Sequence, residues 1–485
     1  MAIKIAGTTV VDDSRGLTNI ATVDATTAAA ISAAGVGGFG TQDFVASGAI
    51  ETGEVVILNA DGTVSVVSST STSAGTSAVF ETASLSYISA TFDSNSNKVV
   101  ISYKDEGNSN YGTAAVGTVS GTSISFGTPV VFESAAVDYT SIIFDSNSNK
   151  VVIAYRDKGN SNYGTAIVGT VSGTSISFGT AAVFETSASI LISATFDSSN
   201  NKVVVGYTDI GNSYSGTAVV GTVSGTSISF GTPVVFTSYA GNDFCSTTFD
   251  SSNNKVVISY RGSGTGLAIV GTVSGTSISF GTPVEHASVS LSGNFITFDS
   301  NSNKVVIAYA FNSGLRNGLA VVGTVSGTSI SFGTPVAFEA DQTTAISIVF
   351  DSNVNKVVIS YRDSGNSSAG TFVVGVVSGT SIKFDSPVTF NTGNSYNIVS
   401  TFDSNSNKVV VTYTDGGNSG YYTTNILTAG STDASSYIGV ATEAISDTAT
   451  GAVTIDGGVT PSKTINNYDL ANASYDSVSF SVAGQ

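Results

Sequence analysis

The side chains best suited to chemistry in this 485-residue sequence recur at the ends of short polar turns. Seven turns of the type DSNSNK begin with aspartate and end with lysine. Alternating side-chain oxygens of this kind can bind calcium, but the turns lack the glycine and the distal glutamate of an EF-hand loop. We therefore expect hairpin turns capped by Asn, with cross-strand ion pairs worth roughly 0.2–1 kcal/mol. The pairs are Asp93/Lys98, Asp145/Lys150, Asp197/Lys202, Asp250/Lys255, Asp299/Lys304, Asp351/Lys356 and Asp403/Lys408.

His286 and Cys245 are the only histidine and the only cysteine. A Cys–His nucleophile pair needs both groups within hydrogen-bond reach and a third group that orients the base. The two residues fall in connections of different repeats, and nothing in the sequence selects a pair of carboxylates for glycoside hydrolysis. We therefore expect no enzyme, no catalytic residue, no bound metal and no cofactor.

The composition excludes several partners. A net charge of −18 argues against nucleic acid and against anionic membrane surfaces. One cysteine excludes an intrachain disulfide and a cysteine-based zinc site. The sequence contains no run of 18 apolar residues, which is about the length that a membrane-spanning helix needs. The first residues, MAIKIAGTTVVDD, lack the basic and apolar regions of a secretory signal, so none is expected.

A repeat of about 50 residues organises most of the chain, which is typical of propeller blades. In the first repeat, alternating and β-branched stretches predict four strands, at 87–93, 98–104, 112–119 and 123–133. Pro129 lies in the fourth strand, and proline is tolerated on a sheet edge, so this strand should form the outer rim. The segment FDSNSNKVVISY and its variants begin at Phe92, Phe144, Phe196, Phe249, Phe298, Phe350 and Phe402.

The two ends of the repeat array complement each other. The seventh repeat lacks its fourth strand, whereas GTSAVFE at 75–81 matches GTPVVFE at 127–133. Because proteins avoid open sheet edges, we expect an all-β chain with a seven-bladed β-propeller, closed by this N-terminal strand and inserted into a small flanking β domain. The expected divisions are an attachment arm at 1–40 with a weak helix candidate at 25–34, the small domain at 41–72 with 429–460, the propeller at 73–428 and a tail at 461–485.

The repeats differ mainly in the loops of one face. The turns after the first and third strands are nearly identical, whereas those after the second and fourth vary, as in scaffolds that carry binding sites. Tyrosine rings beside charged groups suit carbohydrate recognition, although neutral drift in loops that contact nothing is the alternative. Tyr139 and Tyr239 belong to this face. The candidate ligand-binding residues there are Lys104, Asp105, Tyr111, Arg156, Asp157, Tyr163, Asp209, Tyr214, Arg261, Arg316, Arg362 and Asp363.

Several segments resemble virion proteins of marine tailed phages, especially cyanophages. The opening MAIKIAGTTVVDDSRGLTNI resembles their leading segments, and ASGAIETGEVVILNADGTVSVV with YIGVATEAISDTATGAVTIDGGV resembles a small domain of the same group. The repeats resemble those of fibre-like proteins, and YDLANASYDSVSFSVAGQ resembles the start of a different repeat. The resemblance implies a virion-surface protein made in the host cytoplasm, an appendage or fibre with other virion proteins as partners.

Three functions remain open at this point. The first is a phage tail-fibre type protein whose propeller binds a host-surface receptor or glycan during host attachment. The second is a purely structural decoration module or interaction platform, and the third is a glycan-cleaving enzyme. Association into a homo-oligomer also stays open.

Overall fold

The computed structural model describes residues 69–238, 243–262, 264–311 and 316–432 continuously. Outside these ranges it describes the short segments 3–5, 8–11, 41–50, 55–58, 63–66, 437–441, 450–454, 464–465 and 468–469. All regular structure in this part of the chain is β, arranged in antiparallel sheets, and it contains no helix that could span a membrane. The chain divides into two compact units, residues 72–429 and residues 1–71 with 430–485.

The smaller unit contains a sheet built from both ends of the sequence. Its strand order is β3-β41-β40-β4-β5, in which β41 and β40 come from beyond the repeats. The helix candidate at 25–34 and most of the 1–40 and 461–485 segments lie outside the described residues. The strands of this unit are β1 (Ile3–Ile5), β2 (Thr8–Val11), β3 (Thr41–Val45), β4 (Val55–Leu58), β5 (Val64–Val66), β6 (Ser69–Thr70), β39 (Ser431–Thr432), β40 (Tyr437–Ala441), β41 (Thr450–Thr454), β42 (Thr464–Ile465) and β43 (Tyr468–Asp469).

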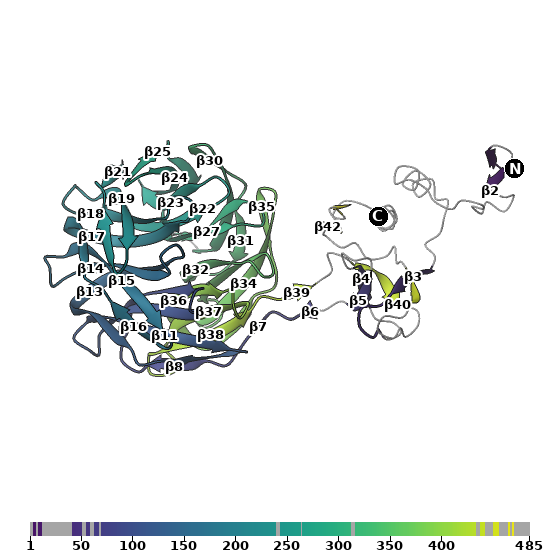
Figure 1. Ribbon diagram of the computed structural model, residues 1–485, viewed down its shortest axis with the longest axis horizontal. Coiled ribbons are helices and arrows are strands. Elements are labelled where there is room, and N and C mark those ends of the chain that lie inside the picture. Colours follow the sequence, from purple (N-terminus) through teal and green to yellow (C-terminus); the bar gives the residue numbers. More distant parts are fainter. Residues whose placement is uncertain are drawn as a thin grey trace. The chain divides into compact units, whose positions relative to one another are not determined.

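In the larger unit each repeat forms one antiparallel sheet around a common axis (Figure 1). The first three strands follow the order predicted from the sequence, with the hydrophobic second strand in the middle. The second strands are β10 (Lys98–Asp105), β14 (Lys150–Asp157), β18 (Lys202–Asp209), β23 (Lys255–Gly262), β28 (Lys304–Phe311), β33 (Lys356–Asp363) and β37 (Lys408–Asp415). The third strands are β11 (Tyr111–Ser120), β15 (Tyr163–Ser172), β19 (Ser215–Ser224), β24 (Thr265–Ser274), β29 (Gly318–Ser326), β34 (Ala369–Ser378) and β38 (Tyr421–Thr428).

The predicted fourth strand is two strands. In the first repeat both β12 and the start of β13 pair with β11, and Pro129 lies in the break between them rather than within a strand. The break begins at Gly127, whose N–H donates to the Val116 carbonyl (2.9 Å). The hairpin pieces are β12 (Ser123–Phe126), β16 (Ser175–Phe178), β20 (Ser227–Phe230), β25 (Ser277–Phe280), β30 (Ser329–Phe332) and β35 (Ser381–Phe384). The separate second pieces are β21 (Val234–Thr237), β26 (Val284–Ala287) and β31 (Val336–Glu339).

Three of the connections expected to be loops are continuous strands. There the chain runs from the outer edge of one sheet to the innermost strand of the next, as in the 16-residue β13 (Val130–Asp145). Consecutive innermost strands contact one another around the axis, and β36 of the seventh repeat also contacts β9 of the first. The other innermost strands are β9 (Leu85–Asp93), β17 (Ala182–Asp197), β22 (Asp243–Asp250), β27 (Leu291–Asp299), β32 (Thr343–Asp351) and β36 (Val388–Asp403).

The N-terminal segment before the first repeat pairs with the seventh repeat. β7 (Ser73–Ala74) and β8 (Ala78–Glu81) both pair with β38, as β12 and β13 pair with β11. Strand β38 therefore has neighbours on both sides, although its own repeat supplies no fourth strand.

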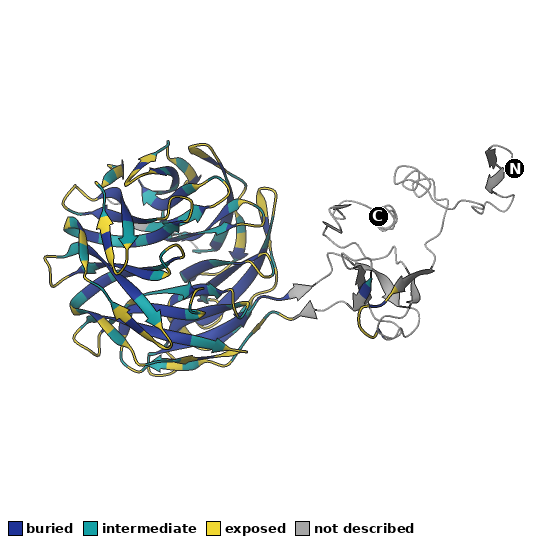
Figure 2. Cartoon of the chain, in the orientation of Figure 1, coloured by how far each residue is buried: buried dark blue, intermediate teal, exposed yellow. Residues whose placement is uncertain are grey.

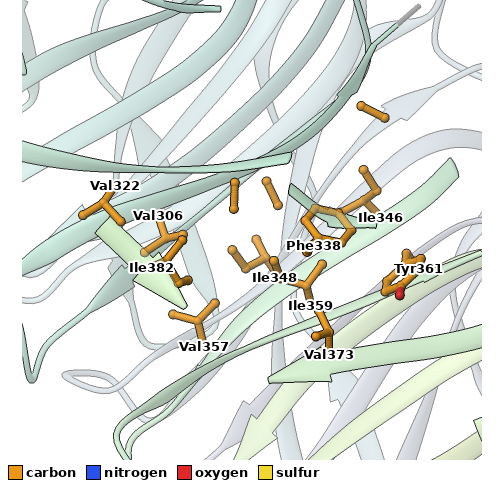
Figure 3. Close-up of a cluster of buried hydrophobic side chains, with 13 residues drawn as sticks. Val306, Val322, Phe338, Ile346, Ile348, Val357, Ile359, Tyr361, Val373 and Ile382 are labelled. Atoms are coloured by element: carbon orange, nitrogen blue, oxygen red, sulfur yellow. The ribbon is translucent and has the colours of Figure 1, made fainter. Parts of the chain in front are cut away.

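The hydrophobic core lies between neighbouring sheets. The buried faces of the second and third strands fill these interfaces (Figure 2). Figure 3 shows the interface of the fifth and sixth repeats, where Phe338 packs near Ile346 and Tyr361. The ring centroids of Phe338 and Tyr361 are 5.2 Å apart. Six such Phe–Tyr contacts recur in the larger unit, and between the fourth and fifth repeats His286 packs against Tyr309 instead.

Candidate functional site

The DSNSNK turns are structural. Asp93 is buried, and its Oδ1 accepts the backbone N–H groups of Asn95 (2.9 Å) and Ser96 (3.0 Å). The aspartates of the other six turns do the same. Each carboxylate is thus held by its own turn. In the sixth repeat the lysine of the turn, Lys356, forms an ion pair with Asp385, with 3.4 Å between Nζ and Oδ2. Within the described ranges no three His, Cys, Asp or Glu side chains form a group that could hold a metal ion.

Four of the candidate binding residues are also turn caps. Asp105, Asp157, Asp209 and Asp363 end the second strands, and all four are buried. Each Oδ1 accepts the N–H of the asparagine three residues later, at 3.1–3.2 Å. The pKa values of Asp105, Asp209 and Asp363 lie above the usual range of an aspartate, and burial is the largest cause. Each of these carboxylates therefore holds the backbone of its own loop.

Four basic candidates occupy one equivalent position. Each lies on a second strand directly opposite a glycine of the third strand, as Lys104 lies opposite Gly112. Arg261 and Arg362 are held locally, because Arg261 Nη1 donates to the Leu291 carbonyl (3.0 Å) and Arg362 Nη2 to Ser368 Oγ (2.9 Å). The position is held by Lys104, Arg156, Arg261 and Arg362, opposite Gly112, Gly164, Gly266 and Gly370.

The remaining candidates are spread around the same face. Tyr111 and Tyr163 begin β11 and β15 and are half-buried. Tyr214 is 46% exposed. The carbonyl of Arg316 accepts the Thr343 N–H (3.0 Å), which fixes the backbone there. Tyr239 lies outside the described residues.

The structure gathers Lys104 and Arg156 into a group that the sequence did not single out. We call Tyr87, Lys104, Asp138, Tyr139, Arg156 and Lys158 the tyrosine cluster. Tyr87 and Tyr139 come from the innermost strands β9 and β13, with ring centroids 4.7 Å apart. The Lys104 Nζ lies 5.6 Å from the centre of the Tyr87 ring. Tyr87 is 37% exposed, so the pair offers an aromatic surface to solvent.

A backbone irregularity positions both rings. Tyr87 and Tyr139 have φ values of 50° and 53°, in the left-handed region that non-glycine residues rarely adopt. The register of β9 against β10 shifts at this point, as in a β-bulge, and the same shift recurs in β13. Bulges redirect side chains and tend to lie beside functional sites. Leu191, Ala345 and Asn397 have positive φ at the equivalent position of other repeats.

Charged groups surround the two rings. Asp138 is buried and pairs with Lys104 (3.2 Å) and with the more exposed Lys158 (3.5 Å). The Arg156 Nε is buried, and among the described residues it has no hydrogen-bond partner. Burial is the main cause that raises the pKa of Tyr139 above its usual range, so its hydroxyl stays protonated and can donate a hydrogen bond. The cluster thus offers aromatic faces, hydroxyl groups and cations within one small area.

His286 and Cys245 do not form a reactive pair. Cys245 packs into the core between the third and fourth repeats, whereas Ala287, next to His286, belongs to the core between the fourth and fifth. Desolvation raises the pKa of the Cys245 thiol to about 12. Burial lowers the pKa of His286 to about 3. Both groups are therefore uncharged near neutral pH, and His286 lies in strand β26 rather than in a loop.

The His286 environment predicts a pH effect on stability. The folded pKa is below the value of about 6.5 in an unfolded chain, so the unfolded state binds the proton more readily. Stability should be complete above pH 6.5 and fall as the pH decreases toward 3, by about 1.4 kcal/mol at pH 5.5. His286→Phe, which restores the residue of the other interfaces, should remove this fall. Urea denaturation of both proteins at pH 8 and 5.5 measures it, and an equal fall in the variant would contradict the assignment.

Comparisons with known proteins identify the fold only. No family model matches the chain, and no curated protein matches it. The chain is similar to the crystal structure of the BP39L lectin from Burkholderia pseudomallei, with 12% identity, a TM-score of 0.54, and coverage of 73% of this chain and 98% of the lectin. It also matches the Dos1 propeller, with 13% identity, a TM-score of 0.45, and coverage of 74% and 95%. At 12% identity the similarity to the lectin shows a shared fold alone.

Proposed function

We propose that this chain is a virion-surface protein of a tailed phage, whose propeller binds a glycan on the host surface through the face that carries the tyrosine cluster. The observation that supports this proposal best is the Tyr87–Tyr139 pair, in which Tyr87 is exposed and Tyr139 half-buried, beside Lys104, Lys158 and Arg156. An aromatic ring can cover the apolar face of a sugar while neighbouring polar groups bond its hydroxyls. The similarity of the fold to a lectin is consistent with this role.

The architecture that would present this face is a closed ring of seven blades. The ring of Phe80 in β8 packs against those of Tyr103 and Phe126, with ring centroids 5.9 Å and 5.0 Å away. One repeat later, Phe132 packs in the same way against Tyr155 and Phe178, with centroids 5.2 Å and 5.7 Å away. The first repeat therefore packs on β8 as the second packs on the first. The contact of β36 with β9 supports a closed circle of innermost strands.

Asp385 stands where the other repeats have a glycine, and this exception also supports a closed ring of blades. A Cβ at Gly127 would lie less than 3.0 Å from the Thr174 carbonyl in the next repeat's Ser-Gly-Thr turn, so only glycine fits. The same holds for Gly75, Gly179, Gly231, Gly281 and Gly333. In the sixth repeat this position is Asp385, whose N–H makes the equivalent bond to the Val374 carbonyl (2.9 Å). The seventh repeat has no such turn, because its third strand ends at Thr428, so a side chain is tolerated.

The proposal is tested with a glycan array. The fluorescently labelled full chain should bind a restricted set of glycans, including those of its host's surface, and an antibody against it should label intact virions. Labelled virions without any glycan binding would favour the structural decoration role. Cleavage of a bound polysaccharide would replace the binding role with the enzymatic one.

A further inference from the structure

A glutamate carboxylate is held in the same way at several interfaces between repeats. Between the fifth and sixth repeats, Glu339 Oε2 accepts the Tyr361 hydroxyl (3.0 Å). Its Oε1 accepts the backbone N–H groups of Ala340 (2.8 Å) and Asp341 (3.1 Å). We call the tyrosine hydroxyl and these N–H groups the donor set. A tyrosine hydroxyl and the N–H two residues later also hold Glu133 and Glu185.

Between the fourth and fifth repeats the glutamate is replaced by Ala287. This residue lies opposite Gly266 of the third strand, as Glu339 lies opposite Gly318. Its methyl group offers no acceptor to the donor set. The equivalent residue is polar in all the other cases, which are Glu81, Glu133, Glu185, Thr237, Glu339 and Asn391.

The donors themselves remain at this interface. Three residues separate Ala287 from the next strand, as three separate Glu339 from its next strand, so Ser288 and Val289 correspond to the two N–H donors. Within the described residues neither N–H has a hydrogen-bond partner. Burial alone raises the pKa of Tyr309 to about 12, and its hydroxyl donates to no group in the described part of the chain.

A pocket of about 500 Å³ lies where the glutamate is missing. Ala287, Ser288, Val289 and Tyr309 line it, so the vacant donor set belongs to its wall. Phe311 lines it as well, with its ring centroid 6.1 Å from that of Tyr309. A volume of this size suits a small molecule. The pocket therefore combines donors that hold a carboxylate elsewhere in this fold with an apolar aromatic wall.

Phe311 also removes a negative charge from the surroundings of the donor set. It lies opposite the first residue of the innermost strand, the position that Asp363 has in the sixth repeat. There the pKa of Asp363 is raised by burial and, next in size, by the charge of Glu339. An anion beside Phe311 meets no such repulsion. Glu285 is exposed and alternates along β26 with the buried His286, so it extends toward the opposite side of the strand.

We propose that this pocket binds a small carboxylic acid, in its ionised form, that carries an aromatic or branched apolar body. The carboxylate accepts the Tyr309 hydroxyl and the Val289 N–H in place of the missing glutamate, and the body packs against Phe311. A cation is not needed, because the glutamates of the other interfaces are held by the same uncharged donors. The site is formed by the fourth and fifth repeats and is separate from the tyrosine cluster of the first two.

The first test compares three probes that share one body and differ in the terminal group. 3-Phenylpropionate, 3-phenyl-1-propanol and 3-phenylpropylamine are titrated onto the full chain at pH 7 by ligand-observed NMR and calorimetry. 3-Phenylpropionate should bind at one site per chain. The alcohol should bind about tenfold more weakly, since it makes only one of the hydrogen bonds, and the amine should not bind.

Two variants test the donor set directly. Tyr309→Phe should weaken 3-phenylpropionate about tenfold and leave the melting temperature unchanged, because this hydroxyl has no partner within the described residues. Ala287→Glu should abolish binding, because its own carboxylate occupies the donors. Tyr361→Phe is the matched control, since it breaks the bond to Glu339 and should lower the melting temperature without changing the affinity.

Three results would overturn the proposal. The first is no saturable binding of 3-phenylpropionate to the parent chain. The second is binding of the amine as tightly as the acid. The third is an unchanged affinity for 3-phenylpropionate in Tyr309→Phe or in Ala287→Glu, each with a melting temperature that shows it to be folded.

Discussion

Removal of residues 1–82 should destabilise the propeller far more than removal of residues 1–71 or 1–40. The two longer truncations remove the same strands of the smaller unit, so their difference isolates β7 and β8. Without β8, β38 loses its outer partner, and the Phe80 contacts with Tyr103, Phe126 and Tyr422 are lost. Losing one such aromatic side chain costs about 3 kcal/mol, before the exposed strand edge is counted.

Thermal melts followed by circular dichroism compare the three truncations. Phe80→Ala in the full chain serves as the milder form of the same change and should melt between the parent and the 1–82 deletion. Equal melting temperatures for the 1–71 and 1–82 deletions would mean that β8 does not hold the seventh repeat to the first.

The second large effect concerns ligand affinity. Tyr87→Ala and Tyr139→Ala should each weaken binding of the host glycan by about 2 kcal/mol, roughly 30-fold, because a central aromatic contact dominates the energy of such sites. Tyr87→Phe should retain most of the affinity, since the ring remains. Arg156→Ala should also weaken binding, because its guanidinium belongs to the same cluster.

Lys150→Ala and Asn147→Ala are the controls, because both lie in a DSNSNK turn on the other face. Affinity is measured for every variant by surface plasmon resonance, after its melting temperature has been compared with that of the parent. Loss of binding in the turn variants alone would assign the site to the wrong face. Unchanged binding in all variants would support a structural platform.

The repeat pattern predicted the sheets well for a physical reason. Alternating and β-branched residues recur in register, so the second and third strands fall within about two residues of their expected bounds. The fourth strand was less accurate, because a break at Gly127 depends on the turn of the next repeat, which no local pattern reveals.

The candidate site stays a prediction. Variation among the loops selected Lys104 and Arg156, together with four aspartates that the structure shows capping turns. Loop sequence alone does not distinguish a carboxylate that faces solvent from one that accepts its own backbone N–H. Tyr87 was assigned to the framework, although its alignment with Tyr139 in the next repeat was a usable signal.

His286 shows a similar limit. Its type and isolation suggested an incidental loop residue, whereas the structure places it at the position of a core phenylalanine, against Tyr309 and Phe332. Alignment of the seven repeats on VVFE, with VEHA as the fifth variant, would have found it.

A crystal structure of the chain with a glycan selected on the array tests the central proposal most directly. We expect a sugar ring stacked on Tyr87 or Tyr139, with a hydroxyl or carboxylate of the glycan within hydrogen-bond distance of Lys158 or Arg156. A glycan bound instead at the DSNSNK turns, with the tyrosine cluster empty, would contradict the proposed site.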